Sequence, residues 1–137
     1  MNDNEMKNGN SGIIIKEDIR LLFVDDEADY ASIIAKRLSR RNINVTCALS
    51  GTDAIRILRK ADFDLCILDL KMGDMDGIEV LKIFKKMIPE MPVIMLTGHG
   101  SAESAREGLA RGAFDYLTKP YALEDLMIII KKAVSGR

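Results

Sequence analysis

Short apolar runs alternate with longer amphipathic stretches along most of the chain. The apolar runs are residues 20–24, 65–68, 93–96 and 114–117, and apolar and polar residues alternate between 43 and 47. Runs of this length bounded by polar residues are typical of β-strands. Residues 29–41, 51–58, 78–88, 101–110 and 123–134 repeat apolar residues at helical spacing. The pattern therefore predicts five strands that alternate with five helices.

This alternation predicts an α/β fold in which helices cover both faces of a parallel sheet. The runs at 20–24, 65–68 and 93–96 are continuously apolar, as expected of central strands that are covered on both sides. The alternating strand at 43–47 and the strand interrupted by Asp115 are predicted to be the edges. We therefore expect a doubly wound, flavodoxin-like, five-stranded sheet of order 2-1-3-4-5. Ligands bind such sheets at the carboxyl ends of the strands, near the switch point between the first and third strands.

The composition mainly excludes classes of protein. The chain has 137 residues, of which 47% are apolar, and its formal net charge is −1. This length fits one domain, and the balanced charge disfavours direct nucleic acid binding. No apolar run approaches the ~20 residues of a membrane span, and the first ten residues lack a secretion signal. Cys47 and Cys66 are compatible with a disulfide, but free buried thiols in a reducing cytoplasm are favoured. We therefore predict a cytoplasmic protein, and the lack of a membrane span predicts no membrane partner.

The domain is expected to cover residues 19–135. Residues 1–18 are rich in Asn, Gly and acidic residues and are predicted to be a flexible leader. The apolar triplet Ile13–Ile15 interrupts this leader, and the sequence assigns it no role.

Polar side chains stand where the predicted strands end. Asp25 and Asp26 follow the first strand, Asp69 follows the third, Thr97 ends the fourth, and Lys119 comes just after the fifth. Each of them alone is explained as an ordinary loop or capping residue. Because the carboxyl ends of parallel strands meet at one edge, all five together indicate a site there.

These residue types indicate phosphoryl chemistry. Clustered carboxylates repel one another and require a cation, and an all-oxygen set favours a hard ion such as Mg²⁺. Lys119 adds a compact positive charge, and Thr97 adds a hydroxyl donor. A carboxylate, a divalent ion and a lysine are the groups that in-line phosphoryl transfer onto an aspartate needs.

The chain from 19 to 134 resembles the receiver domain of response regulators in bacterial two-component systems. The resemblance is carried by five stretches in the right order: 22–27 (LFVDDE), 68–72 (LDLKM), 76–77 (DG), 95–98 (MLTG) and 112–120 (GAFDYLTKP). The text around 97–101 and 113–116 is similar to receivers of nitrogen-regulatory-type transcriptional activators. A standalone regulator and a receiver within a longer one are equally compatible with these residues.

The resemblance implies a chemical role for each matching acid. Asp69 would be the phosphoacceptor that takes the phosphoryl group from a sensor histidine kinase. Asp25 and Asp26 would hold Mg²⁺ together with Asp69 and the backbone carbonyl of Lys71. In relatives proline commonly follows the methionine of this loop, whereas here Gly73 follows Met72, which gives the loop more conformational freedom.

The resemblance also implies a switch. Thr97 and Lys119 would contact the phosphoryl group, and Tyr116 would turn inward when Thr97 moves. Gly98 and His99 would lie at the rim of the site, although an exposed histidine without function is an equal alternative. The bond between Lys119 and Pro120 would be cis.

Relatives often form homodimers through the fourth helix, fifth strand and fifth helix. Ile128, on the outer face of the fifth helix, is therefore a candidate contact in such a dimer.

Two other functions stay open at this point. A phosphohydrolase of the haloacid-dehalogenase type also uses an aspartate nucleophile and Mg²⁺, but that family requires an aspartate two residues later, where this chain has Lys71. A receiver that docks without being phosphorylated is the other alternative, and the complete set of acids, Thr97 and Lys119 argues against it.

Overall fold

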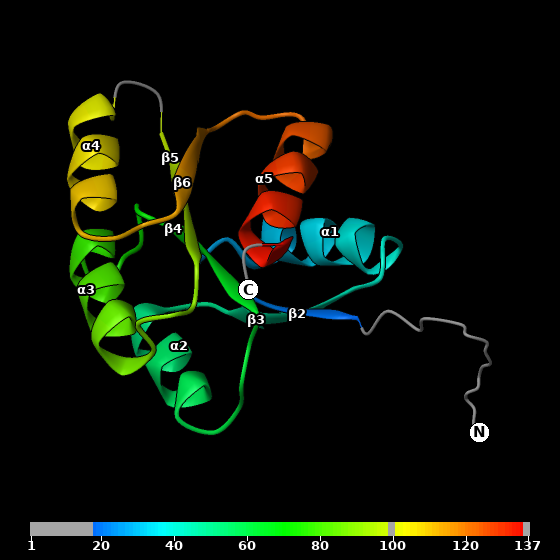
Figure 1. Ribbon diagram of the computed structural model, residues 1–137, viewed down its shortest axis with the longest axis horizontal. Coiled ribbons are helices and arrows are strands. Elements are labelled where there is room, and N and C mark those ends of the chain that lie inside the picture. Colours follow the sequence, from blue (N-terminus) through cyan, green and yellow to red (C-terminus); the bar gives the residue numbers. More distant parts are fainter. Residues whose placement is uncertain (1–17, 99–100, 136–137) are drawn as a thin grey trace.

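The computed structural model describes residues 18–98 and 101–135 of the chain, and within them five strands alternate with five helices (Figure 1). The strands are β2 (Ile19–Val24), β3 (Ile43–Ala48), β4 (Leu65–Asp69), β5 (Val93–Thr97) and β6 (Asp115–Thr118). The helices are α1 (Ala28–Ser39), α2 (Gly51–Leu58), α3 (Gly77–Met87), α4 (Ala102–Ala110) and α5 (Leu123–Ser135). All five predicted strands and all five predicted helices are confirmed, with ends that shift by at most two residues.

All neighbouring strands run parallel, in the order β3-β2-β4-β5-β6. When the strands are counted as they occur along the chain, this is the predicted order 2-1-3-4-5. The burial pattern of the strands explains their order in the sheet. Every residue of β4 and β5 is buried, whereas β3 and β6 alternate between covered and exposed positions. The predicted central and edge strands are therefore confirmed.

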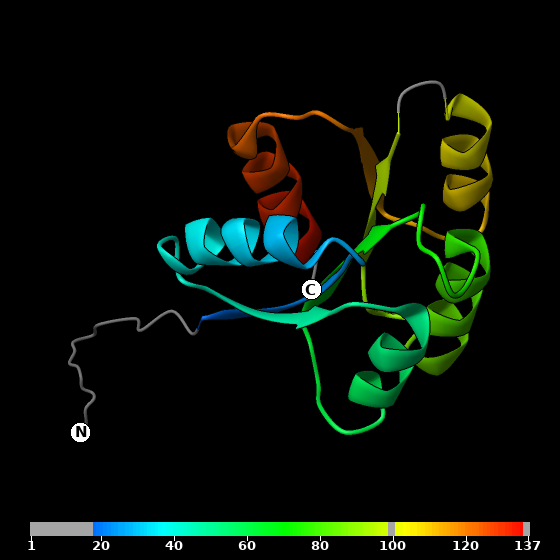
Figure 2. The same cartoon turned by 180° about the vertical axis from the view of Figure 1, so that it is seen from behind.

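The sheet separates two apolar cores. Leu21 and Phe23 of β2 pack in the core beneath α1 and α5, whereas Leu22 and Val24 pack in the core beneath α2 and α3. Successive residues of a strand point to opposite faces, so one apolar run supplies both cores. The two views of the ribbon show α1 and α5 on one face of the sheet and α2, α3 and α4 on the other (Figures 1 and 2).

Two helix starts fix the loops that approach the carboxyl edge of the sheet. The N-cap Ser50 accepts a hydrogen bond from the Asp53 N–H, at 3.0 Å, at the start of α2. Asp76 accepts one from the Ile78 N–H, at 3.3 Å, at the start of α3. A Cβ on Gly77 would lie 2.5 Å from the Leu70 Cα, so only glycine lets α3 begin this close to the segment that follows β4.

Several sequence-based expectations lie partly or wholly outside the described residues. Except for Asp18, the predicted leader of residues 1–18, with Ile13–Ile15, is outside them, and so is His99. Both cysteines are described: neither forms a disulfide, and Cys66 is buried. Of the helices that the structure describes, none has the length and apolar character needed to cross a membrane.

Candidate functional site

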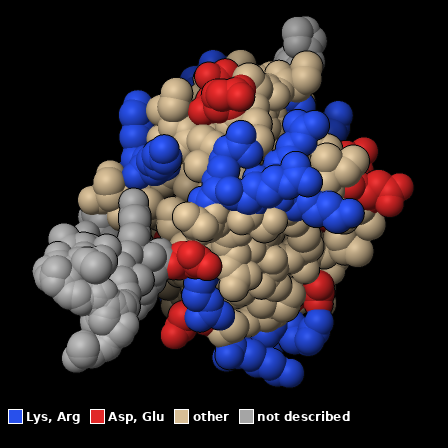
Figure 3. Space-filling view, turned by 90° about the vertical axis from the view of Figure 1, so that its right-hand side faces the viewer, with Lys and Arg blue, Asp and Glu red and all other residues tan. Residues whose placement is uncertain are grey.

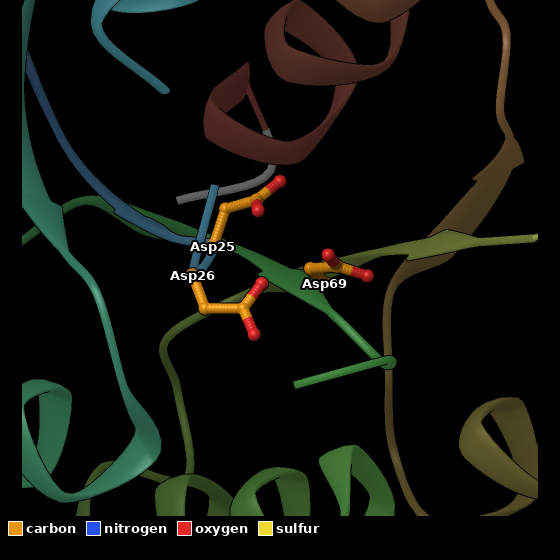
Figure 4. Close-up of side chains that lie close together, drawn as sticks. All are labelled: Asp25, Asp26 and Asp69. Atoms are coloured by element: carbon orange, nitrogen blue, oxygen red, sulfur yellow. The ribbon is translucent and has the colours of Figure 1, made fainter. Parts of the chain in front are cut away.

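Three carboxylates meet at the carboxyl ends of the adjacent strands β2 and β4. One oxygen from each of Asp25, Asp26 and Asp69 lies within 4.8 Å of the others. Figure 4 shows the three side chains around a common space. Asp25 is 0% exposed and Asp69 is 6% exposed, whereas Asp26 is open to solvent. The predicted convergence of the three acids is therefore confirmed.

The ammonium group of Lys119 bridges the two buried acids. Its Nζ lies 3.2 Å from Asp25 Oδ2 and 3.3 Å from Asp69 Oδ2, and it donates a hydrogen bond to each. Glu27 Oε1 is 3.8 Å from the same Nζ. Lys119 follows β6 directly, and the bond between Lys119 and Pro120 is cis, as the resemblance implied. Glu27 was not among the predicted site residues, although it directly follows the aspartate pair.

Backbone N–H groups hold the three carboxylates in place. The Glu27 N–H donates to Asp25 Oδ1 at 2.9 Å, and the Lys71 N–H donates to Asp69 Oδ1 at 3.0 Å. The Gly73 N–H donates to Asp26 Oδ2 at 3.2 Å. A proline at position 73 could not make this last bond, because proline has no backbone N–H. Glycine in place of the usual proline at position 73 therefore allows a hydrogen bond between this loop and Asp26.

Burial and charge act against each other on the reactive groups. Burial raises the pKa of the Asp69 carboxyl, and the Lys71 N–H and the Lys119 ammonium only partly offset that effect. Burial lowers the pKa of Lys119, but the Asp69 and Asp25 carboxylates outweigh it and hold the pKa above its ordinary value. Lys119 is therefore charged at neutral pH. Its single positive charge balances only part of the negative charge of the Asp25, Asp26 and Asp69 carboxylates.

The donor set fits a small divalent cation. All three side chains offer oxygen, which Mg²⁺ prefers, and Mg²⁺ binds oxygen at about 2.0–2.1 Å. Two ligands on opposite sides of one ion are thus about 4 Å apart. The three carboxylate oxygens lie within 4.8 Å of one another, so they need to move only slightly closer together to bind one ion. The excess negative charge beyond what Lys119 balances supports the same assignment.

The predicted switch residues Thr97 and Tyr116 lie on β5 and β6, outside the cluster of three acids. Thr97 is buried at the end of β5, and its hydroxyl donates to the Leu117 carbonyl at 3.3 Å and lies 3.4 Å from Thr118 Oγ1. Tyr116, on β6 beside Met95, is 39% exposed. Gly98 directly follows Thr97.

Two tyrosines that were not among the predicted site residues complete the surroundings of Lys119. The Tyr30 ring lies 4.7 Å from Lys119 Nζ, and the hydroxyl groups of Tyr30 and Tyr121 share a hydrogen bond. Tyr30 belongs to the predicted helix at 29–41, whose apolar spacing indicates only that its ring packs against the sheet. The position of its phenol four residues after Asp26 was the available signal.

The match to known proteins agrees with this geometry. Residues 21–131 match the family model described as the response regulator receiver domain. The chain therefore belongs to the response regulator receiver domain family, whose members are signalling phosphoacceptors. This membership sets aside the haloacid-dehalogenase alternative.

Individual relatives point the same way. The chain is 40% identical over 117 residues to a putative NtrX-like response regulator of Rickettsia bellii, covering 84% of this chain and 24% of that protein. It is 38% identical over 119 residues to the transcriptional regulatory protein ZraR of Escherichia coli, covering 87% and 27%. A receiver domain structure from Clostridium thermocellum superposes with a TM-score of 0.83 at 36% identity, covering 86% and 95%. The chain thus spans about a quarter of the length of these two curated relatives.

Proposed function

We propose that Asp69 accepts a phosphoryl group from the phosphohistidine of a sensor histidine kinase, with Mg²⁺ held by Asp25, Asp26, Asp69 and the Lys71 carbonyl. The observation that supports this most is the contact between the buried Asp69 carboxylate and the Lys119 ammonium, whose Nζ lies 3.3 Å from Asp69 Oδ2. The neighbouring Asp25 carboxylate would otherwise repel Asp69. A nucleophile and a positive charge for the transferring group stand side by side. The two further acids supply the metal ligands.

The transfer would proceed in line. An Asp69 oxygen forms a bond to phosphorus while the bond from phosphorus to the histidine nitrogen breaks, and the bond's electron pair stays on the imidazole. Lys119 shifts from the carboxylates to a phosphoryl oxygen, and Thr97 Oγ1 leaves the Leu117 carbonyl to donate to another. Bound Mg²⁺ would neutralise the charge that develops on the phosphoryl oxygens.

The hydroxyl of Thr97 would also start the switch. Its present acceptor, the Leu117 carbonyl, lies on β6, the strand that carries Tyr116. When the hydroxyl turns to the phosphoryl group, this contact between β5 and β6 is lost, and Tyr116 moves inward. Hydrolysis by water would then restore the free Asp69, at a rate that Lys71, two positions after Asp69, and His99, two positions after Thr97 in the sequence, would influence.

Incubation with acetyl phosphate and Mg²⁺ should attach one phosphoryl group per chain. Intact-mass measurement would detect the adduct, and peptide mapping after borohydride reduction would locate it at Asp69. A chelator of Mg²⁺ should remove the labelling, because the carboxylates repel the incoming phosphate without the metal. Labelling at another residue, or equal labelling with the chelator, would contradict the proposal.

We also propose that the phosphorylated protein forms homodimers through α4, β6 and α5. The two helices each carry an exposed apolar residue, Leu109 on α4 and Ile128 on α5, which would stay exposed when Tyr116 turns inward. On the face that lies at the right in Figure 1, Lys and Arg side chains gather in a band (Figure 3), and two copies that met through these bands would repel each other.

Sedimentation with and without beryllofluoride and Mg²⁺ tests the dimer. The mass should double with beryllofluoride, and Ile128→Glu should prevent the doubling. Ile33→Glu is the matched control, because Ile33 on α1 is 53% exposed and Ile128 is 52% exposed. An unchanged mass would contradict the dimer, and an Ile128→Glu protein that still dimerises would contradict the contact.

The localisation and the partners of the protein are part of the same proposal. We place the protein in the cytoplasm, with the kinase as its partner and without direct contact of this domain with nucleic acid or membrane. The division into a leader at 1–18 and a domain at 19–135 stays a prediction.

A further inference from the structure

The ammonium group of Lys119 rests against an aromatic ring as well as against the carboxylates. Tyr30, in the first turn of α1, places its ring centroid 4.7 Å from Lys119 Nζ. This distance lies within the range in which a cation is attracted to the negative face of a ring. Tyr30 is partly buried, so water screens the attraction less than it would at an open surface.

The position of the ring is itself fixed from two sides. The Tyr30 hydroxyl shares a hydrogen bond with the Tyr121 hydroxyl, which ties α1 to the segment that follows Lys119. On the side of the sheet, the Phe23 ring lies 6.2 Å from the Tyr30 ring at a tilt of 57°. Burial raises the pKa of the Tyr30 hydroxyl, so the phenol stays neutral at neutral pH.

A ring and a carboxylate hold an ammonium group in different ways. The hydrogen bonds from Lys119 to Asp25 and Asp69 require particular directions, whereas the attraction of a ring face tolerates small shifts of the cation. The ring can therefore keep the ammonium near the site while its hydrogen bonds pass from carboxylate to phosphoryl oxygens.

We propose that Tyr30 is a positioning residue for phosphorylation, whose ring holds the Lys119 ammonium beside Asp69 while the phosphoryl group arrives. This inference rests on the proposed function of Asp69. It assigns the effect to the ring and gives the hydroxyl only the secondary task of fixing the ring through Tyr121.

Three variants separate the ring from the hydroxyl. Tyr30→Leu removes the ring, Tyr30→Phe keeps the ring and removes the hydroxyl bond, and Tyr121→Phe removes the same bond from the other side. Acetyl phosphate is the donor, so that kinase docking does not contribute. The labelling rate should fall about three- to tenfold in Tyr30→Leu, and the two phenylalanine variants should stay within about twofold of the original protein.

Nuclear magnetic resonance gives a readout that does not depend on activity. The ring of Tyr30 should shift the resonances of the Lys119 side-chain protons upfield. This shift should persist in Tyr30→Phe and disappear in Tyr30→Leu. Mg²⁺ affinity, measured by titration, should stay near the original value in all three variants, because the three carboxylates are unchanged.

The outcomes are distinct. If the original protein is not labelled, the proposed function fails. If the original protein is labelled and Tyr30→Leu is labelled equally fast, only the positioning role fails. A Tyr30→Phe protein as slow as Tyr30→Leu would overturn the role of the ring in favour of the hydroxyl. A parallel loss of Mg²⁺ affinity in Tyr30→Leu would also overturn the proposal, because the acid cluster itself would then be disturbed.

Discussion

Asp69→Asn is expected to abolish both phosphorylation by acetyl phosphate and the binding of beryllofluoride with Mg²⁺. An amide cannot form the acyl phosphate bond, and its substitution removes one of the three carboxylates that face the common space. The loss of labelling should be complete within the detection limit of intact-mass measurement. Fluorine resonance of bound beryllofluoride provides a second measurement without covalent chemistry.

The stability of Asp69→Asn separates lost chemistry from lost structure. Burial raises the pKa of Asp69, so the folded state at neutral pH holds a carboxylate whose charged form burial disfavours. A neutral amide of the same shape removes that cost, and in the absence of Mg²⁺ the variant should be no less stable in urea than the original protein. A phosphorylated Asp69→Asn protein would refute the assignment of the acceptor.

A matched control uses the same chemical change away from the site. Asp62→Asn alters an exposed aspartate in the loop between α2 and β4, which joins β4 at its amino end. It should be labelled at the original rate. If Asp62→Asn lost labelling as well, the effect of Asp69→Asn would not be specific to the site. A receiver that only docks would show no labelling in any of the three proteins.

The fold was predictable because its signals are periodic and local. The continuous run 65–68 and the alternating strand at 43–47 differ in which faces are covered, and that difference alone placed β4 in the centre and β3 at the edge. Topology then explains why Asp25 and Asp69, 44 positions apart, meet: β2 and β4 are parallel neighbours, with Val24 opposite Leu68.

Other features of the site depend on loop conformation, which no periodic pattern encodes. The Gly73 N–H, in the loop after β4, donates to Asp26, in the loop after β2, whereas the sequence predicts only conformational freedom from this glycine. Tyr30 satisfies the helical apolar spacing whether or not its ring meets Lys119. Thr97 is predicted to contact the phosphoryl group, and in the structure its hydroxyl donates to the Leu117 carbonyl of β6. Each of these depends on a direction that the residue type leaves undetermined.

Lys119→Met should reduce the rate of phosphorylation by about a hundredfold or more, since it removes a preorganised positive charge from the transferring group. The same substitution should raise the affinity for Mg²⁺. The ammonium now occupies an oxygen of both Asp25 and Asp69, and without it Mg²⁺ meets more negative charge. We therefore expect tighter Mg²⁺ binding together with slower labelling.

Stability measurements complete this test. Without Mg²⁺, Lys119→Met leaves two buried carboxylates facing each other, and the free energy of unfolding should fall by about 1–3 kcal/mol. Because Mg²⁺ binds only the folded site, adding it should restore most of this loss. Lys119→Arg retains the charge but replaces the compact ammonium, so Mg²⁺ affinity should stay near the original value while labelling slows. Unchanged labelling of Lys119→Met would show that the ammonium balances charge at rest and takes no part in the transfer.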